Sequence, residues 1–252
     1  MPHTGRAYAC ESAVVTGGAS GIGRAVAEGL ATDGARIFVA DLDVEAANRV
    51  ADAICHDGGR AEAVRVDVAD SQEVIALFAE VQKRVERLDL LVNCAGLLEA
   101  PAAIEDTTDD LWDRTIAVNL TGTFNCCREA VRWMKRHRTG RVINVASIAA
   151  LTPTPGALPY AAAKAGVVQL SKSLARETAP HNLRVNVIAP GYVQTPMLDQ
   201  LADEFKEGIL RRTPLHRFAS PSEIAAAVRF LVQADADYFT GQILSPNGGL
   251  VM

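Results

Sequence analysis

The stretch AVVTGGASGIGRAVAEGLATDG, residues 13–34, joins a short apolar run to a helical segment through a glycine-rich turn. The glycines at positions 17, 21 and 23 follow a G-x-x-x-G-x-G spacing. Glycine lets the backbone turn sharply and approach a phosphate group, whose charge is attracted by the free N–H groups at the start of the next helix. The stretch therefore predicts a strand–turn–helix unit that can hold a dinucleotide, although a tight turn requires glycine without a ligand as well.

The next apolar run ends in an acid that supports this interpretation. Asp41 closes RIFVAD, residues 36–41, where a carboxylate can accept both ribose hydroxyls of an adenosine and repel a 2′-phosphate. Neither Ser20 in the glycine turn nor Leu42 after the acid is basic, which favours NAD over NADP. Asp41 could instead cap the following helix, but Asp43 fits that role better. Asp67, at the end of the third predicted strand, could equally bond an adenine amino group or cap a helix.

Apolar runs and amphipathic segments alternate along the whole chain. Nearly continuous apolar runs predict strands buried on both faces of a parallel sheet, at residues 13–16, 36–41, 62–67, 88–93, 141–147, 183–190 and 241–245. Two helix starts carry capping signals, Asp70 with Glu73 and Ser220 with Glu223. We expect an α/β fold, a Rossmann-type doubly wound parallel sheet of about seven strands with helices on both faces. It forms one domain over 1–252, with a cofactor half to about residue 145 and a catalytic and lid half after it.

The composition excludes several classes of partner. The 252 residues are 49% hydrophobic, and the net charge of −5 gives no reason to expect nucleic acid or an anionic membrane. We interpret the basic run from Arg132 to Arg141 as a solvated helix end, where cations complement the helix dipole. The first ten residues, MPHTGRAYAC, contain no apolar core, and no run is long enough to cross a membrane.

Cysteine and histidine usage predicts a reduced, metal-free protein. The five cysteines show no C-x-x-C pair, and we interpret all of them as packing residues of a cytoplasmic protein: Cys10, Cys55, Cys94, Cys126 and Cys127. The five histidines are scattered, with none at ligand spacing from a cysteine or carboxylate.

A polar pair lies within the small apolar residues of LPYAAAKAG, residues 158–166. Tyr160 and Lys164 are four residues apart and therefore share one face of a helix. The ordinary pKa of tyrosine is about 10, so this phenol needs nearby positive charge to act as a base, and the lysine ammonium can provide it. Taken alone, the pair could also be a half-buried tyrosine beside an extended lysine.

With these features together, the chain resembles the classical short-chain dehydrogenase/reductase family over essentially its whole length. The resemblance rests on TGGASGIG (16–23), NCAG (93–96), VNL (118–120), VAS (145–147), YAAAK (160–164) and APG (189–191). Two positions depart from the family pattern, since Cys94 replaces a usual asparagine and Asn247 a common aspartate.

The resemblance implies a role for each matching residue. Tyr160 would be the acid/base, Lys164 would lower its pKa and grip the nicotinamide ribose, and oxidised nicotinamide would add positive charge. Ser147 would bond the substrate oxygen, and Asn119, in a long helix starting near Thr108, would hold water that links Lys164 to solvent. Thr195 either contacts the carboxamide or caps a helix. The dinucleotide contacts expected beside Tyr160 and Lys164 are Gly17, Ser20, Gly21, Ile22, Gly23, Asp41, Leu42, Asp67, Val68, Asn93, Ala95, Gly96, Pro190, Gly191, Val193 and Thr195.

Three functions fit these residues. The first is an NAD-dependent dehydrogenase that interconverts a modest secondary alcohol and a ketone, in an apolar pocket formed by Ser147, Tyr160, Leu97, Leu151, Tyr192 and Met197. The second is an NADP-dependent 3-oxoacyl-thioester reductase, which would need a basic residue near Ser20 or Leu42 and a positive surface for the carrier. The third is a dinucleotide sensor without activity. The segment 192–215 is expected to be a mobile lid, and the family resemblance implies a homotetramer built through two long helices.

Overall fold

The computed structural model describes residues 10–199 and 201–252. Its strands are β1 (Ser12–Thr16), β2 (Arg36–Asp41), β3 (Arg60–Arg65), β4 (Leu90–Asn93), β5 (Gly140–Val145), β6 (Leu183–Ile188) and β7 (Ile243–Leu244). They form one seven-stranded sheet in the order β3-β2-β1-β4-β5-β6-β7. Every neighbouring pair is parallel. The Rossmann-type sheet predicted from the alternating runs is confirmed.

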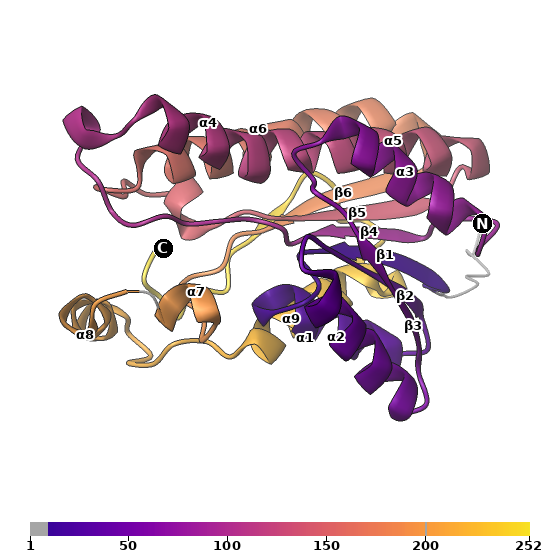
Figure 1. The fold of residues 1–252 in the computed structure, drawn as a ribbon, viewed down its shortest axis with the longest axis horizontal. Coiled ribbons are helices and arrows are strands. Elements are labelled where there is room, and N and C mark those ends of the chain that lie inside the picture. Colours follow the sequence, from indigo (N-terminus) through magenta and orange to yellow (C-terminus); the bar gives the residue numbers. More distant parts are fainter. Residues whose placement is uncertain (1–9, 200) are drawn as a thin grey trace.

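Helices cover both faces of the sheet (Figure 1). On one face lie α3 (Ser71–Gln82), α4 (Asp109–Ile116), α5 (Gly122–His137) and α6 (Leu158–Thr178), and on the other α1 (Gly21–Thr32), α2 (Val44–His56) and α9 (Pro221–Val232). A π-helical turn, Ala117–Thr121, joins α4 to α5. Two short helices, α7 (Pro196–Asp199) and α8 (Asp203–Arg212), lie beyond the sheet in the predicted lid segment, of which residue 200 is outside the described residues.

Each face has its own apolar core because strand residues alternate between the two faces. Val15, Ile37 and Val92 pack with α1, α2 and α9, whereas Val14, Leu91 and Val142 pack with α3 and α5. Caps start several helices where the sequence predicts them. Asp70 accepts from the backbone N–H of Gln72 at 2.7 Å, and Ser220 with Glu223 forms a reciprocal capping box at α9.

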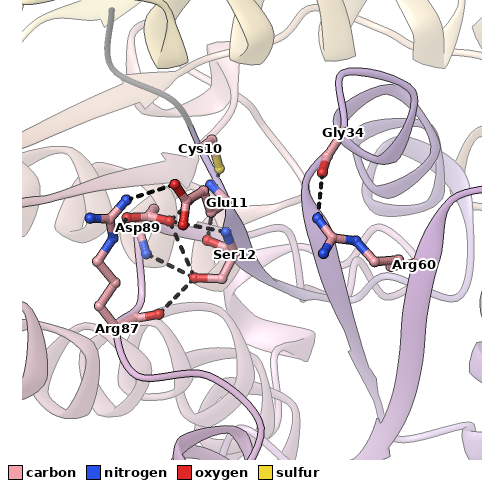
Figure 2. Close-up of polar contacts among 7 residues, drawn as sticks. All are labelled: Cys10, Glu11, Ser12, Gly34, Arg60, Arg87 and Asp89. Carbon is pink, nitrogen blue, oxygen red and sulfur yellow. Dashed lines mark hydrogen bonds and ion pairs between the residues drawn. The ribbon is translucent and has the colours of Figure 1, made fainter. Parts of the chain in front are cut away.

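At the end of the sheet where the strands begin, a buried carboxylate bonds to two neighbouring segments (Figure 2). Asp89, 1% exposed, accepts from the backbone N–H groups of Glu11 and Ser12 at 2.9 and 3.0 Å. Arg87 donates to the same carboxylate at 2.8 Å. These bonds tie the start of β1 to the start of β4, away from the strand ends that face the glycine turn.

Three sequence interpretations are wrong at particular residues. The third strand begins two residues earlier than predicted and is an edge strand without a fully buried residue, because β3 pairs only with β2. Arg141 is no solvated helix-end residue, since it lies in β5, is 2% exposed, and donates to Asp237 at 2.6 Å. Cys55 is exposed and so does not pack in a core, although all five cysteines are unpaired.

Two further observations hold for the described part of the chain. None of its helices is long and apolar enough to cross a membrane. No group of three potential metal-ligating side chains occurs within residues 10–199 and 201–252. The N-terminal segment MPHTGRAYA lies outside the described residues, so the prediction made for it stays a prediction.

Candidate active site

The glycine turn after β1 is built around close backbone approaches. Gly17 has a φ of +64°, and a Cβ there would come within 2.7 Å of the Ala95 backbone. The turn therefore lies against the loop that follows β4. Gly21 has a φ of +50° and lies beside Thr195, whose Cγ2 would be 3.1 Å from an added Cβ. Only glycine satisfies such positions without strain.

The residues at this turn fit a dinucleotide. Ser20 precedes α1 in extended conformation, and its side chain makes no capping hydrogen bond. The first N–H groups of α1 thus keep the anion-binding character of an uncapped helix start. Asp41, at the end of β2, accepts from the backbone N–H of Ala19 at 3.0 Å and from that of Asp43 at 3.1 Å. Its carboxylate is held beside the turn, with further lone pairs for hydroxyl donors.

Hydrogen bonds decide which of the nearby acids cap helices. Asp43, not Asp41, caps α2, accepting from Ala46 at 2.9 Å. Asp67 lies after β3, and α3 is capped by Asp70 instead. The Asp67 carboxylate accepts from the backbone N–H of Ala69 at 2.9 Å. Leu42 is 59% exposed, whereas Val68 is buried beneath α5.

The cluster around Lys164 lies where β4 and β5 end. Lys164 is 4% exposed, and its Nζ donates to the Val145 carbonyl at 3.0 Å. Its Nζ is 5.6 Å from the centroid of the Tyr160 ring. A Cβ on Gly96 would be 2.7 Å from Asn119 Oδ1 and 3.3 Å from Lys164 Nζ. Three segments distant in sequence are therefore brought together, as predicted.

Asn119 lies in the π-helical turn rather than in an uninterrupted helix. The helix does start near Thr108 as predicted, and the Thr108 side chain caps α4 by accepting from the Leu111 N–H. The Asn119 amide donates to the carbonyls of Leu97 and Thr115, both at 3.0 Å. Its Oδ1 accepts from the Leu97 N–H at 3.3 Å. π-Turns often mark functional positions, and here the turn locks a fully buried amide onto the loop after β4.

Burial sets the protonation of the tyrosine and the lysine. It raises the pKa of Tyr160, while a hydrogen bond with Ser147 opposes the rise. It lowers the pKa of Lys164 from 10.5 to about 8. For Tyr160, desolvation outweighs the hydrogen bond with Ser147, and the expectation that Lys164 makes the phenol easier to ionise stays a prediction. A protonated Tyr160 beside Ser147 is arranged to donate a proton to an oxygen.

Residues 190–195 close the other side of the site. The Pro190 carbonyl accepts from the Ile148 N–H at 2.9 Å, and Gly191 lies against Asn247, whose Cα would be 2.8 Å from an added Cβ. Val193 forms an isolated parallel bridge with Ala219. The Thr195 hydroxyl donates to the Val193 carbonyl at 3.2 Å, so its side chain does not cap α7.

A cavity of about 350 Å³ opens between the loop after β4 and the short helices α7 and α8. Its lining is mostly apolar and consists of Leu98, Glu99, Ala100, Pro101, Met197, Leu201, Ala202 and Phe205. Of the predicted substrate residues only Met197 lines it, and Leu151 is 39% exposed. Tyr192 lies near both the cavity and the cluster, because its ring meets that of Phe205 edge-on with centroids 6.4 Å apart and it contributes to the raised pKa of Tyr160.

Comparison with known proteins agrees with this arrangement. A family model described as enoyl-(acyl carrier protein) reductase matches residues 17–251. The chain belongs to the classical short-chain dehydrogenase/reductase family. As a member of this short-chain family it is an NAD(P)-dependent oxidoreductase acting on CH–OH groups.

Individual relatives cover nearly the whole chain. The 3-oxoacyl-[acyl-carrier-protein] reductase of Staphylococcus aureus (strain Mu50) is 40% identical over 96% of this chain and 98% of its own. The protein of the same name from Aquifex aeolicus is 37% identical over 94% and 96%. A structure described as a putative gluconate dehydrogenase from Agrobacterium tumefaciens superimposes with a TM-score of 0.93 at 34% identity, covering 97% and 98%.

Sequence reasoning missed the cavity wall and a set of buried polar residues. Neither Phe205 nor Leu201 belongs to a motif. Phe205 lines the cavity because it lies on α8, and Leu201 because it lies just before that helix. Asn144 and Ser171 are both 0% exposed. They lie in segments whose apolar character predicts simple packing, so nothing in the sequence pattern distinguishes them.

Proposed function

We propose that this protein reduces the ketone of a 3-oxoacyl thioester, with Tyr160 as proton donor. The observation that carries the proposal is the apolar cavity, whose wall residue Phe205 packs against Tyr192 near Tyr160. Such a wall suits a hydrocarbon chain, since burying apolar surface is favourable. The names of the bacterial relatives support the same substrate class.

Each side chain has a defined task in this reaction. A bound nicotinamide dinucleotide supplies the hydride. Ser147 and Tyr160 hold the substrate oxygen, and the Tyr160 hydroxyl gives its proton as negative charge develops there. Lys164 and Asn119 lie on the buried side of the cluster, and through them the Tyr160 hydroxyl regains the proton that it has donated. The dinucleotide contacts are those expected from the sequence, from the glycine turn to Thr195.

We propose NAD(H) rather than NADP(H) as the preferred cofactor. Asp41 is fixed beside the glycine turn by two backbone donors, and a carboxylate held there repels a 2′-phosphate. Leu42 and Ser20 supply no cation to offset that repulsion.

A small-alcohol dehydrogenase is the second candidate, supported by the likeness to the putative gluconate dehydrogenase. A polyhydroxylated acid requires polar partners for each hydroxyl. The cavity offers one charged residue, Glu99, which is itself anionic and pairs with Arg114 at 3.4 Å. This lining disfavours such a substrate. Membership of an enzyme family leaves the sensor hypothesis without support.

We further propose that the protein is a cytoplasmic homotetramer. A groove of about 440 Å³ runs between α5 and α6. It is lined by Phe124, Val131, Leu170 and Leu174, with charged residues at its rim. Phe124 is 45% exposed, and a second copy of the same pair of helices would cover it.

The experiment that tests the function compares two substrates with two variants. Acetoacetyl thioester and gluconate-type polyols are offered with NADH, NADPH or their oxidised forms. We expect the thioester to be reduced fastest. Tyr160→Phe should lose about 10²–10⁴-fold in kcat and still bind NADH, whereas Tyr238→Phe, at a fully exposed ring, should keep the wild-type rate. Faster turnover of the polyols, or an active Tyr160→Phe, would refute the proposal.

A further inference from the structure

A row of buried polar side chains crosses the sheet at the ends of three adjacent strands. Thr16 of β1 is paired in register with Asn93 of β4, and Asn93 with Asn144 of β5. Their neighbours two residues earlier, Val14, Leu91 and Val142, belong to one apolar core, so all three side chains point to that same face. Figure 1 shows α5 and α6 covering it. The three polar residues are 1%, 3% and 0% exposed. Polar groups placed so deeply require partners.

The partners form one directed chain of hydrogen bonds. The Ala95 N–H donates to Thr16 Oγ1 at 3.3 Å, and that hydroxyl donates to Asn93 Oδ1 at 3.4 Å. Asn93 Nδ2 donates to Asn144 Oδ1 at 2.8 Å, and Asn144 Nδ2 to Ser171 Oγ at 2.8 Å. The chain ends where the Ser171 hydroxyl donates to the Val167 carbonyl at 2.6 Å.

Every side chain in this series of hydrogen bonds accepts one bond and donates another. Bonds arranged in one direction polarise one another, so each link strengthens the next. The packing between sheet and helices excludes water, so loss of the Ser171 hydroxyl would remove the acceptor that the Asn144 amide uses. The chain therefore holds its members at one fixed spacing. Cys127 of α5 lies alongside, with its Sγ 3.4 Å from Asn93 Nδ2.

The two ends of the chain lie at the two halves of the site. Thr16 directly precedes the glycine turn, and Ala95 belongs to the loop against which Gly17 packs. Ser171 lies two turns after Lys164 on α6, so both face β5. Lys164 donates to Val145, the residue after Asn144, and the two contacts together fix how α6 lies along β5.

We propose that Asn144 and Ser171 are positioning residues, which set the Tyr160 and Lys164 side chains of α6 against Ser147 and the dinucleotide turn. This inference rests on the proposed function for its kinetic readout. A shift of α6 along β5 would move the Tyr160 hydroxyl relative to Ser147. Misplacement by about 1 Å is enough to cost about 10²-fold in rate.

The test compares two buried hydroxyls on the same helix. Ser171→Ala breaks the last link, and Thr178→Val is the matched control. Thr178 is also 0% exposed and donates to the carbonyl four residues earlier, Leu174, at 2.8 Å, but it receives no bond from the sheet. We expect Ser171→Ala to lower kcat about tenfold or more, to shift the pH profile of kcat, and to leave the Kd for NADH within twofold. Ser171→Thr, which keeps the hydroxyl, should recover part of the rate.

Equal kcat losses in Ser171→Ala and Thr178→Val, or no loss in either, would show that the chain only stabilises the fold. If the wild-type protein reduces no thioester or ketone, the proposed function is refuted. The positioning role is then tested separately, by crystal structures of the two variants. An unchanged separation between Ser147 Oγ and the Tyr160 hydroxyl in Ser171→Ala would then overturn the positioning role, while an increase confined to this variant would support it.

Discussion

The buried ammonium group of Lys164 lowers the stability of the folded protein and contributes to the reactivity of the site. Its side chain is enclosed by α6, β5 and the loop after β4, and burial brings its pKa to about 8. In the unfolded chain the ammonium keeps its ordinary pKa near 10.5, so the unfolded state binds the proton more tightly. The charge therefore opposes folding below pH 8, and this cost is relieved as the pH rises from about 8 to 10.5.

Replacing Lys164 by methionine tests this trade. At pH 7 we expect Lys164→Met to be more stable by about 1–2 kcal/mol, because desolvation is relieved while the bond to Val145 is lost. The advantage should shrink as the pH rises from about 8 and vanish above 10.5, where the wild-type side chain is neutral in both states. Urea unfolding at the two pH values measures it. A variant that is less stable than wild type at both would contradict the explanation.

Asp41 makes a second prediction at the scale of a single residue. Asp41→Asn removes the charge but keeps an acceptor for the Ala19 N–H. We expect the affinity for NADPH relative to NADH to rise by about tenfold or more, since the repulsion of a phosphate dianion is lost. Asp43→Asn is the control, because Asp43 caps α2 without reaching the turn. Titration of nucleotide fluorescence gives both constants. A ratio that moves equally in the two variants would exclude Asp41 as the determinant.

At the scale of elements, the sequence predicts best where several local signals agree. All seven strands lie within two residues of the ranges that their apolar runs predict. β3 and β7 lie at the sheet edges, where one neighbour is missing and none of the strand residues is fully buried, so the apolar pattern marks their ends less sharply. The spacing of Tyr160 and Lys164 reveals their shared helix face, because four residues make about one turn.

Other elements leave no signal in a linear pattern. The π-turn around Asn119 depends on its bonds to Leu97 and Thr115, and the loop of Leu97 is distant in sequence. The cavity needs α8 to be placed against the loop after β4 before Phe205 can be recognised as lining it. Asn144 and Ser171 become partners only once β5 and α6 are packed. Tertiary contacts thus decide what local periodicity leaves open.

For the whole molecule, the groove between α5 and α6 decides the proposed assembly. Phe124 projects from α5, and the Arg128 guanidinium lies 5.2 Å from its ring centroid. We expect Phe124→Glu to convert tetramers into smaller species, because a buried charge without a partner is costly. Light scattering after size-exclusion chromatography gives the mass. Phe230→Glu, on α9 and 38% exposed, is the control and should leave the mass unchanged. A Phe124→Glu tetramer would place the interface elsewhere.

The site draws its segments from β1, β4, β5 and β6, so a single bound dinucleotide would bridge parts of the chain that otherwise meet only through the sheet. Binding of the dinucleotide then raises the thermal stability of the protein as well as preparing the site for reaction. A compound that binds only the native protein, present at 100 times its Kd, adds about 2.7 kcal/mol to the free energy of unfolding. Melting curves recorded with a library of nucleotides and thioesters can therefore rank cofactors and substrates before any turnover is seen.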